Sequence, residues 1–132
     1  MAGCEALSRT AAFWINLLGV WVFEAAATTL AVSVSPAWGL LAAYLGCFNG
    51  LTHLLVAAVR RRANPGLITS VLLLLPVGLA ALWVLRGEMR SHPVIHAVSI
   101  GVVVLEHAMI VGWVGFRRTR MRVARPCPEA SQ

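Results

Sequence analysis

The chain has 132 residues, of which 59% are hydrophobic and 12% charged, and its net charge is +6. A soluble domain of this length cannot bury so much apolar surface, and soluble proteins average about 25% charged residues. These totals exclude an ordinary soluble protein and make lipid the expected solvent.

The basic excess does not indicate a nucleic-acid partner. All 11 basic residues are arginines, and they gather at the ends of apolar runs, where membrane proteins carry them. The 3 cysteines show no CxxC spacing, so we expect neither a disulfide framework nor a zinc site. No nucleotide-binding or haem motif is visible, and we expect no metal and no cofactor.

Four apolar runs follow one another along the chain and predict an all-α membrane protein. Each run is long enough to cross roughly 30 Å of hydrocarbon at about 1.5 Å per residue, and in lipid the backbone must satisfy its own hydrogen bonds as a helix. Short links make successive helices antiparallel neighbours. We expect a four-helix transmembrane bundle, a single domain over residues 1–116 and a tail, 117–132, that is basic and then polar with prolines. The four runs are residues 11–32, 37–59, 67–85 and 94–116.

The arginines predict the orientation of this bundle. Arg86 and Arg90 fall on one side of a four-span arrangement, and all other arginines fall on the opposite side. The positive-inside rule then places the N- and C-termini in the cytoplasm. Glu24 interrupts the first apolar run, so we interpret this run as an uncleaved span rather than a signal peptide. The high content of Ala, Val and Arg is typical of a GC-rich bacterial source, and we expect a multi-pass protein of the bacterial inner (plasma) membrane.

Polar side chains recur within the predicted spans. Glu24, Asn49 and Glu106 come out near the midplane, roughly 15–20 Å from the cytoplasmic helix ends, and Asn16 and His53 lie closer to the cytoplasm. Spacings of eight and four residues put Asn16 with Glu24, and Asn49 with His53, on shared helix faces. Because a carboxylate facing lipid costs several kcal/mol, we expect these faces to point into the bundle.

The third run contains Pro76, which lacks a backbone N–H. A proline in this position predicts a kink that opens space in a small bundle. The alternative is a proline tolerated for packing alone.

Three segments resemble the HXXEE family of small membrane proteins over roughly residues 45–85. That family pairs an N-x-x-x-H element with a P-G-x-x-T turn and a Leu-rich span containing proline. The corresponding segments here are 49–53 (NGLTH), 64–69 (NPGLIT) and 73–76 (LLLP).

The family takes its name from a His, two residues and two Glu in the first span. In this chain Glu24 stands at the first acid, Trp21 replaces the His and Ala25 replaces the second Glu. The motif is therefore degenerate, and the resemblance implies no metal or acid–base role that needs the complete set.

The leading hypothesis for function is a membrane-embedded enzyme without a cofactor. Two buried carboxyl groups in unlike surroundings can divide into general acid and general base, and a carboxyl that stays neutral in hydrocarbon is a proton donor. We expect Glu106 and Glu24 to perform isomerisation, cyclisation, or epoxide opening or hydrolysis on a small lipophilic substrate from the bilayer. The predicted substrate-binding residues are Asn49, His53, Trp21, Asn16 and His107.

Other classes remain open at this point. The alternative function is a small proton-coupled or lipophile-binding transporter or resistance protein that acts as a homodimer, and another is a structural partner in a larger complex. The GxxxG spacing of Gly46 and Gly50 permits close helix approach, either within the chain or in a dimer. The carboxyl groups can equally serve as interhelical hydrogen-bonding contacts, and His107 as a packing residue.

Overall fold

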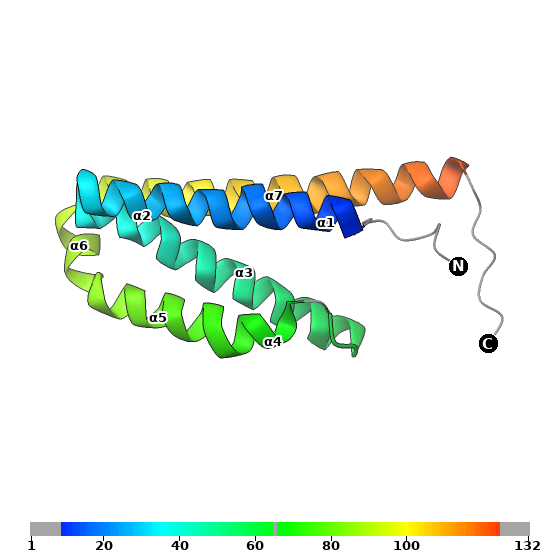
Figure 1. Ribbon diagram of the computed structural model, residues 1–132, viewed down its shortest axis with the longest axis horizontal. Helices are drawn as coiled ribbons and strands as arrows, with labels where there is room; N and C mark the ends of the chain where they lie inside the picture. The colour runs from blue at the N-terminus through cyan, green and yellow to red at the C-terminus, as the bar shows by residue number, and fades with distance from the viewer. Residues whose placement is uncertain (1–8, 65, 125–132) are drawn as a thin grey trace.

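A computed structural model describes residues 9–64 and 66–124. These residues are almost entirely helical (Figure 1). Two segments, η1 and η3, are π-helical, and η2 is a turn of 3₁₀-helix. In chain order the elements are α1 (Arg9–Ile15), η1 (Asn16–Val22), α2 (Phe23–Ser33), η2 (Pro36–Trp38), α3 (Gly39–Arg60), α4 (Leu67–Thr69), η3 (Ser70–Leu74), α5 (Leu75–Val84), α6 (Arg86–Ser91) and α7 (Pro93–Ala124).

Within the described residues, four continuous helical stretches are long and apolar enough to cross a membrane, so the chain is a multi-pass membrane protein. The prediction of four apolar helices is confirmed, and the predicted runs agree with these stretches to within about two residues at each end. The first part of the predicted tail, however, continues the last helix as far as Ala124. Residues 1–8 and 125–132 of the predicted domain and tail lie outside the described residues. The four stretches are Phe13–Ser33, Pro36–Arg60, Leu67–Val84 and Pro93–Arg117.

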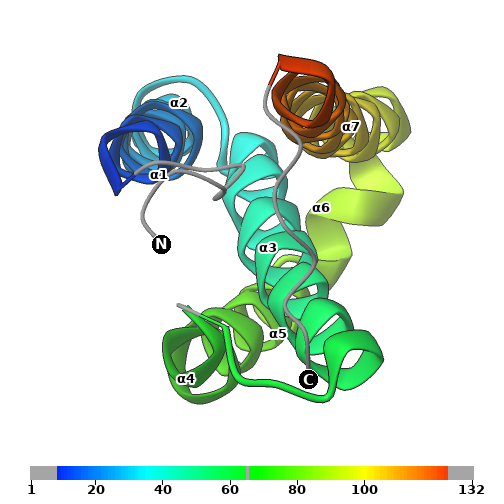
Figure 2. The same ribbon diagram turned by 90° about the vertical axis from the view of Figure 1, so that its right-hand side faces the viewer.

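Helix α3 is the centre of the fold. It packs against α2, α5 and α7, and Figure 2 shows these helices arranged around it. In its most apolar window 33% of the residues are buried within the chain, against 6–11% in the other three stretches. The remaining surface of those stretches is free to face lipid. The arrangement is thus three helices around a central one, and the outer three do not all turn their polar faces toward a common axis.

Small residues allow α3 and the third span to approach closely. A Cβ on Gly78 would lie 2.7 Å from Cys47 Sγ, and a Cβ on Gly50 would lie 2.6 Å from Leu75 Cγ. A Cβ on Gly46 would lie 3.4 Å from the Leu74 carbonyl oxygen. The GxxxG pair of α3 is therefore used inside the chain, which is the first of the two alternatives that the sequence left open.

The third span changes its helical geometry just before Pro76. The π-helical segment η3 (Ser70–Leu74) lies immediately N-terminal to α5, whose second residue is this proline. A π-turn widens the helix locally and is one of the usual ways in which a helix accommodates an interruption. The first span contains a second π-helical segment, η1.

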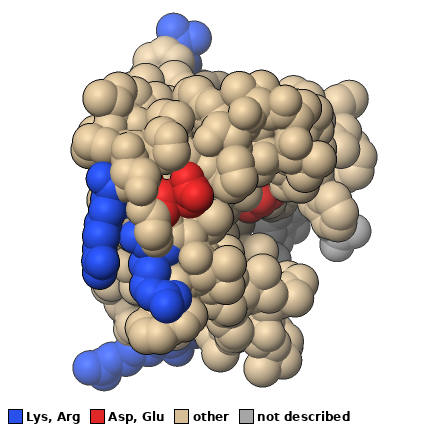
Figure 3. All heavy atoms as spheres, turned by 90° about the vertical axis from the view of Figure 1, so that its left-hand side faces the viewer, with Lys and Arg blue, Asp and Glu red and all other residues tan. Residues whose placement is uncertain are grey.

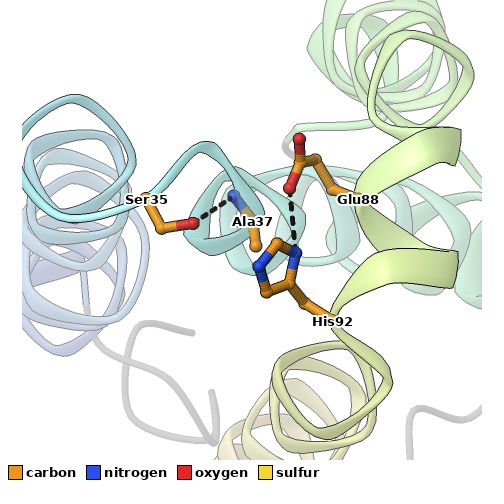
Figure 4. Close-up of polar contacts among 4 residues, drawn as sticks. All are labelled: Ser35, Ala37, Glu88 and His92. Carbon is orange, nitrogen blue, oxygen red and sulfur yellow. Dashed lines mark hydrogen bonds and ion pairs between the residues drawn. The ribbon is translucent and has the colours of Figure 1, made fainter.

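The links at the end of the molecule that carries α6 are held by local polar contacts (Figure 4). Ser35 Oγ accepts a hydrogen bond from Ala37 N at 3.3 Å and caps η2. His92 Nδ1 lies 3.0 Å from Glu88 Oε2, one turn earlier. These contacts order the turns at the ends of the spans.

Candidate functional site

A groove of about 630 Å³ lies between the first, second and third spans. Viewed from the end that carries α6, the surface is hollowed between the first-span and third-span helices, and acidic atoms are visible in this hollow (Figure 3). We call it the Glu24 groove. It is lined by Asn16, Trp21, Glu24, Asn49 and His53, five of the residues that the sequence predicted for a site. Further polar lining comes from Thr28, Thr69 and Ser70.

His53 is held in place by Asn64. The amide nitrogen Nδ2 of Asn64 donates a hydrogen bond to the His53 carbonyl oxygen at 2.8 Å, and its oxygen Oδ1 lies 2.6 Å from His53 Nδ1. Because an amide oxygen only accepts, Nδ1 must carry the proton. In the neutral ring Nε2 is then the acceptor, and it has no hydrogen-bond partner among residues 9–64 and 66–124.

Gly66 completes this arrangement. Its backbone is in the left-handed region, with φ at +95°, where glycine is the favoured residue. A Cβ at this position would lie 2.8 Å from His53 Cε1 and 3.0 Å from Nε2. The turn between the second and third spans therefore packs directly against the imidazole ring of His53. Asn64 and Gly66 were not predicted as site residues, although both stand in the segment that resembles the HXXEE family.

Ser70 is a second lining residue that the sequence analysis did not identify. Its side chain is 0% exposed, and its Oγ has no hydrogen-bond partner among the described residues. Buried hydroxyl groups are normally hydrogen-bonded, so an unpaired one beside a groove is an exception to the usual pattern. Both π-helical segments also border this groove, through Asn16 and Trp21 of η1 and Ser70 of η3. Segments of this kind occur frequently at functional sites.

The structure does not place Glu106 in the Glu24 groove, so the predicted pair of Glu24 and Glu106 is not assembled in one cavity. Glu106 lines a separate groove of about 650 Å³ between the first span and α7, where it faces Gly19. We call it the Glu106 groove. Both Gly19 and Glu24 belong to the first span, but Gly19 lines the Glu106 groove and Glu24 lines the other. The first span therefore separates the two carboxyl groups.

His107 belongs to neither groove lining. Its Nδ1 lies 3.0 Å from the Val103 carbonyl oxygen, which can only accept, so this nitrogen donates. Glu106 Oε2 lies 2.7 Å from the same nitrogen, an ion-pair contact without the direction of a hydrogen bond. The ring also packs against Phe48, with centroids 5.7 Å apart. These contacts favour the packing alternative for His107 over substrate binding.

The described residues bring together no group of three or more His, Cys, Asp or Glu side chains in the manner of a metal site. The lining of the Glu24 groove includes one imidazole, one carboxyl group, two asparagines and hydroxyl groups.

These features define a small multi-pass membrane protein with a groove between its spans that is lined in part by polar side chains. A family model matches residues 4–81, more than half of the sequence, and the chain belongs to the family described as proteins of unknown function with an HXXEE motif. No curated protein and no solved structure matches the chain.

The matched segment has a direct structural meaning. Every residue that lines the Glu24 groove, from Asn16 to Ala81, falls inside it. The match also begins well before the segment in which the sequence resemblance was seen, and it includes the degenerate first-span motif around Glu24. Helix α7, with Glu106 and His107, lies outside it. The Glu24 groove is thus built wholly by the part of the chain that defines the family.

Proposed function

We propose that this protein is a membrane-embedded enzyme that performs acid–base chemistry, without a cofactor, on a small lipophilic molecule in the Glu24 groove. One observation carries the proposal: an imidazole whose tautomer is set by Asn64 lines the same intramembrane groove as a carboxyl group. Intramembrane ionisable residues are costly to place in lipid, and they commonly mark sites of function.

The contacts of His53 support a role as general base. Asn64 holds the proton on Nδ1, which leaves the lone pair of Nε2 to accept a proton from the substrate. Glu24 is the complementary general acid, because a carboxyl group surrounded by hydrocarbon can donate a proton in its neutral form. This assignment gives His53 the second catalytic role that the sequence analysis gave to Glu106.

Such a pair can shift a double bond. His53 removes a proton from a carbon next to the double bond, Glu24 delivers a proton to the far carbon, and the electron pair moves between them. The substrate gains one proton and loses one, so no oxidant, reductant or second substrate is needed. Cyclisation follows the same balance, with protonation of an alkene by Glu24 before ring closure and removal of a proton by His53 after it. The catalyst is reset when the proton on His53 returns to Glu24.

The remaining groove residues have supporting roles. Asn49 lies one turn before His53 on the same helix face, where its amide can orient a polar group of the substrate. Asn16 adds a polar side chain to the lining, and Trp21 forms part of the wall against an apolar body. The groove lies beside the first and third spans, most of whose surface is free to face lipid, and this position suits a substrate dissolved in lipid.

We also propose that both termini face the cytoplasm of a bacterium and that the protein resides in its inner membrane. The helix ends near Arg60 to Arg62 and near Arg117 lie at one end of the molecule, and α6, with Arg86 and Arg90, lies at the other (Figure 1). The richer arginine set supports a cytoplasmic position for the first of these ends.

The test is a comparative metabolite profile. The gene is deleted in its host and replaced by the wild type, by Glu24→Gln, by His53→Phe or by Glu88→Gln. We expect a lipophilic precursor to accumulate in the deletion strain. The wild type and Glu88→Gln, which changes a carboxyl group of α6 paired with His92, should restore the product. Glu24→Gln and His53→Phe should not, at equal protein levels in the membrane.

A different pattern would contradict the proposal. If the pools of lipophilic metabolites are the same in all strains and only export or tolerance changes, the chain moves or binds its ligand without converting it. The carrier alternative would then take the place of the enzyme.

A further inference from the structure

The Glu106 groove plays no part in the proposed function, yet it places a carboxyl group deep in an apolar setting. Its walls come from the first span and from α7, and they are formed largely by Trp14, Leu18, Ile110 and Trp113. The Glu106 side chain is 13% exposed. Such a carboxylate is strongly disfavoured in hydrocarbon unless a positive charge lies beside it.

The described residues supply only part of that positive charge. Among them, the nearest ion-pair partner of Glu106 is His107, at 2.7 Å. The same His107 nitrogen donates to the Val103 carbonyl oxygen at 3.0 Å, a contact that the neutral ring makes equally well. With a neutral ring, His107 offers no formal positive charge to an ionised Glu106, and Oε2 has no directed hydrogen bond among the described residues.

We propose that the Glu106 groove binds a lipophilic organic cation. The cationic centre lies against the Glu106 carboxylate, and the apolar substituents lie between the walls formed by Trp14 and Trp113. Gly19 lets the first span lie directly against the carboxyl group, since a Cβ there would lie 3.0 Å from Glu106 Oε1.

Arg117 is the feature that would favour an anion instead, and its position argues against that. It follows Glu106 by eleven residues on the same helix, which is about 16 Å at 1.5 Å per residue. Its guanidinium already lies over the Trp113 ring, 4.9 Å from the centroid. The positive charge of Arg117 therefore lies at the mouth of the groove, and the carboxyl group of Glu106 lies in its interior.

The experiment uses two probes of the same shape and opposite charge, tetraphenylphosphonium and tetraphenylborate. The full chain is placed in nanodiscs of zwitterionic phosphatidylcholine, and binding is measured by equilibrium dialysis against empty nanodiscs. We expect saturable binding of the phosphonium to the wild type and to Glu88→Gln, and no saturable binding of the borate. Glu106→Gln should weaken phosphonium binding by about tenfold or more.

Three results would overturn the inference. Equal binding of both probes would show that hydrophobicity alone drives the interaction, and preference for the borate would assign the groove to Arg117 and an anion. Loss of phosphonium binding in Glu24→Gln, with retention in Glu106→Gln, would place the cation in the other groove. The comparison of the two probes on the wild type needs no variant, so the test stands even if Glu106→Gln fails to fold. Its outcome is also independent of the metabolite profile, which tests the Glu24 groove.

Discussion

Replacement of Gly66 by alanine should uncouple His53 from Asn64. The new Cβ would lie 2.8 Å from His53 Cε1, 3.0 Å from Nε2 and 3.2 Å from Nδ1, so the ring must move. The backbone at φ +95° adds a cost of about 1–2 kcal/mol for an L-residue in the left-handed region. Loss of the hydrogen bond between the two side chains adds about 0.5–1.5 kcal/mol. We therefore expect Gly66→Ala to reduce the free energy of unfolding by about 1.5–3.5 kcal/mol.

The matched control is Gly87→Ala in α6. This glycine has ordinary helical φ, and a Cβ there would meet nothing within 4 Å, so the substitution should be neutral or stabilising by up to about 1 kcal/mol. The assay is equilibrium unfolding of the purified protein by SDS in mixed micelles. Nitrogen-15 NMR of labelled histidines then reports which nitrogen of His53 carries the proton. We expect the wild type and Gly87→Ala to keep the proton on Nδ1, and Gly66→Ala to show a mixture. If Gly66→Ala matched its control in stability and kept the single tautomer, the argument for a locked His53 would be wrong.

Three further substitutions test the packing around the central helix, each by the same unfolding assay. Gly78→Ala should lower the free energy of unfolding by about 2 kcal/mol or more, because its Cβ would lie 3.0 Å from the Ala43 carbonyl oxygen as well as against a side chain. The control is Gly112→Ala, where a Cβ meets nothing within 4 Å and no stability should be lost. Equal values for the two variants would refute the close approach of α3 and α5. Tyr44→Phe should cost about 0.5–1.5 kcal/mol, since it removes the 2.7 Å hydrogen bond to His96, and an unchanged stability would mean that this bond has no net value. Ser99→Ala should be neutral or stabilising, because the hydroxyl group is 0% exposed and has no partner among the described residues; a large loss would reveal a partner for it.

The membrane character of the chain and its four helices follow from the sequence alone. In hydrocarbon an unpaired backbone amide costs several kcal/mol, so an apolar run of sufficient length has helix as its accessible conformation. The sharing of one face by Asn49 and His53 follows equally from local geometry, because residues four apart always neighbour each other on a helix. The helix faces that carry these polar residues could be anticipated on these grounds, and five of the residues predicted for a site line the Glu24 groove.

The pairing of functional groups across helices was decided by the tertiary structure. The sequence shows that Glu24 and Glu106 each lie deep in a span, but it does not show which neighbouring helix each of these side chains faces. Packing of the small residues of α3 against the third span makes α3 the central helix, and the first span then presents Glu24 to one groove and Gly19, with Glu106 opposite, to another.

The contact between Asn64 and His53 is the second feature that could not be predicted from local sequence rules. Asn64 lies eleven residues further along the chain, beyond the end of α3, and reaches His53 because the backbone reverses there. That reversal depends on two residues with positive φ, Arg61 and Gly66. Hydrophobic pattern and helix period thus determine which segments cross the membrane and which residues share a helix face. The contacts between segments depend on how close two backbones can approach and where the chain turns, and these properties exist only in the folded protein.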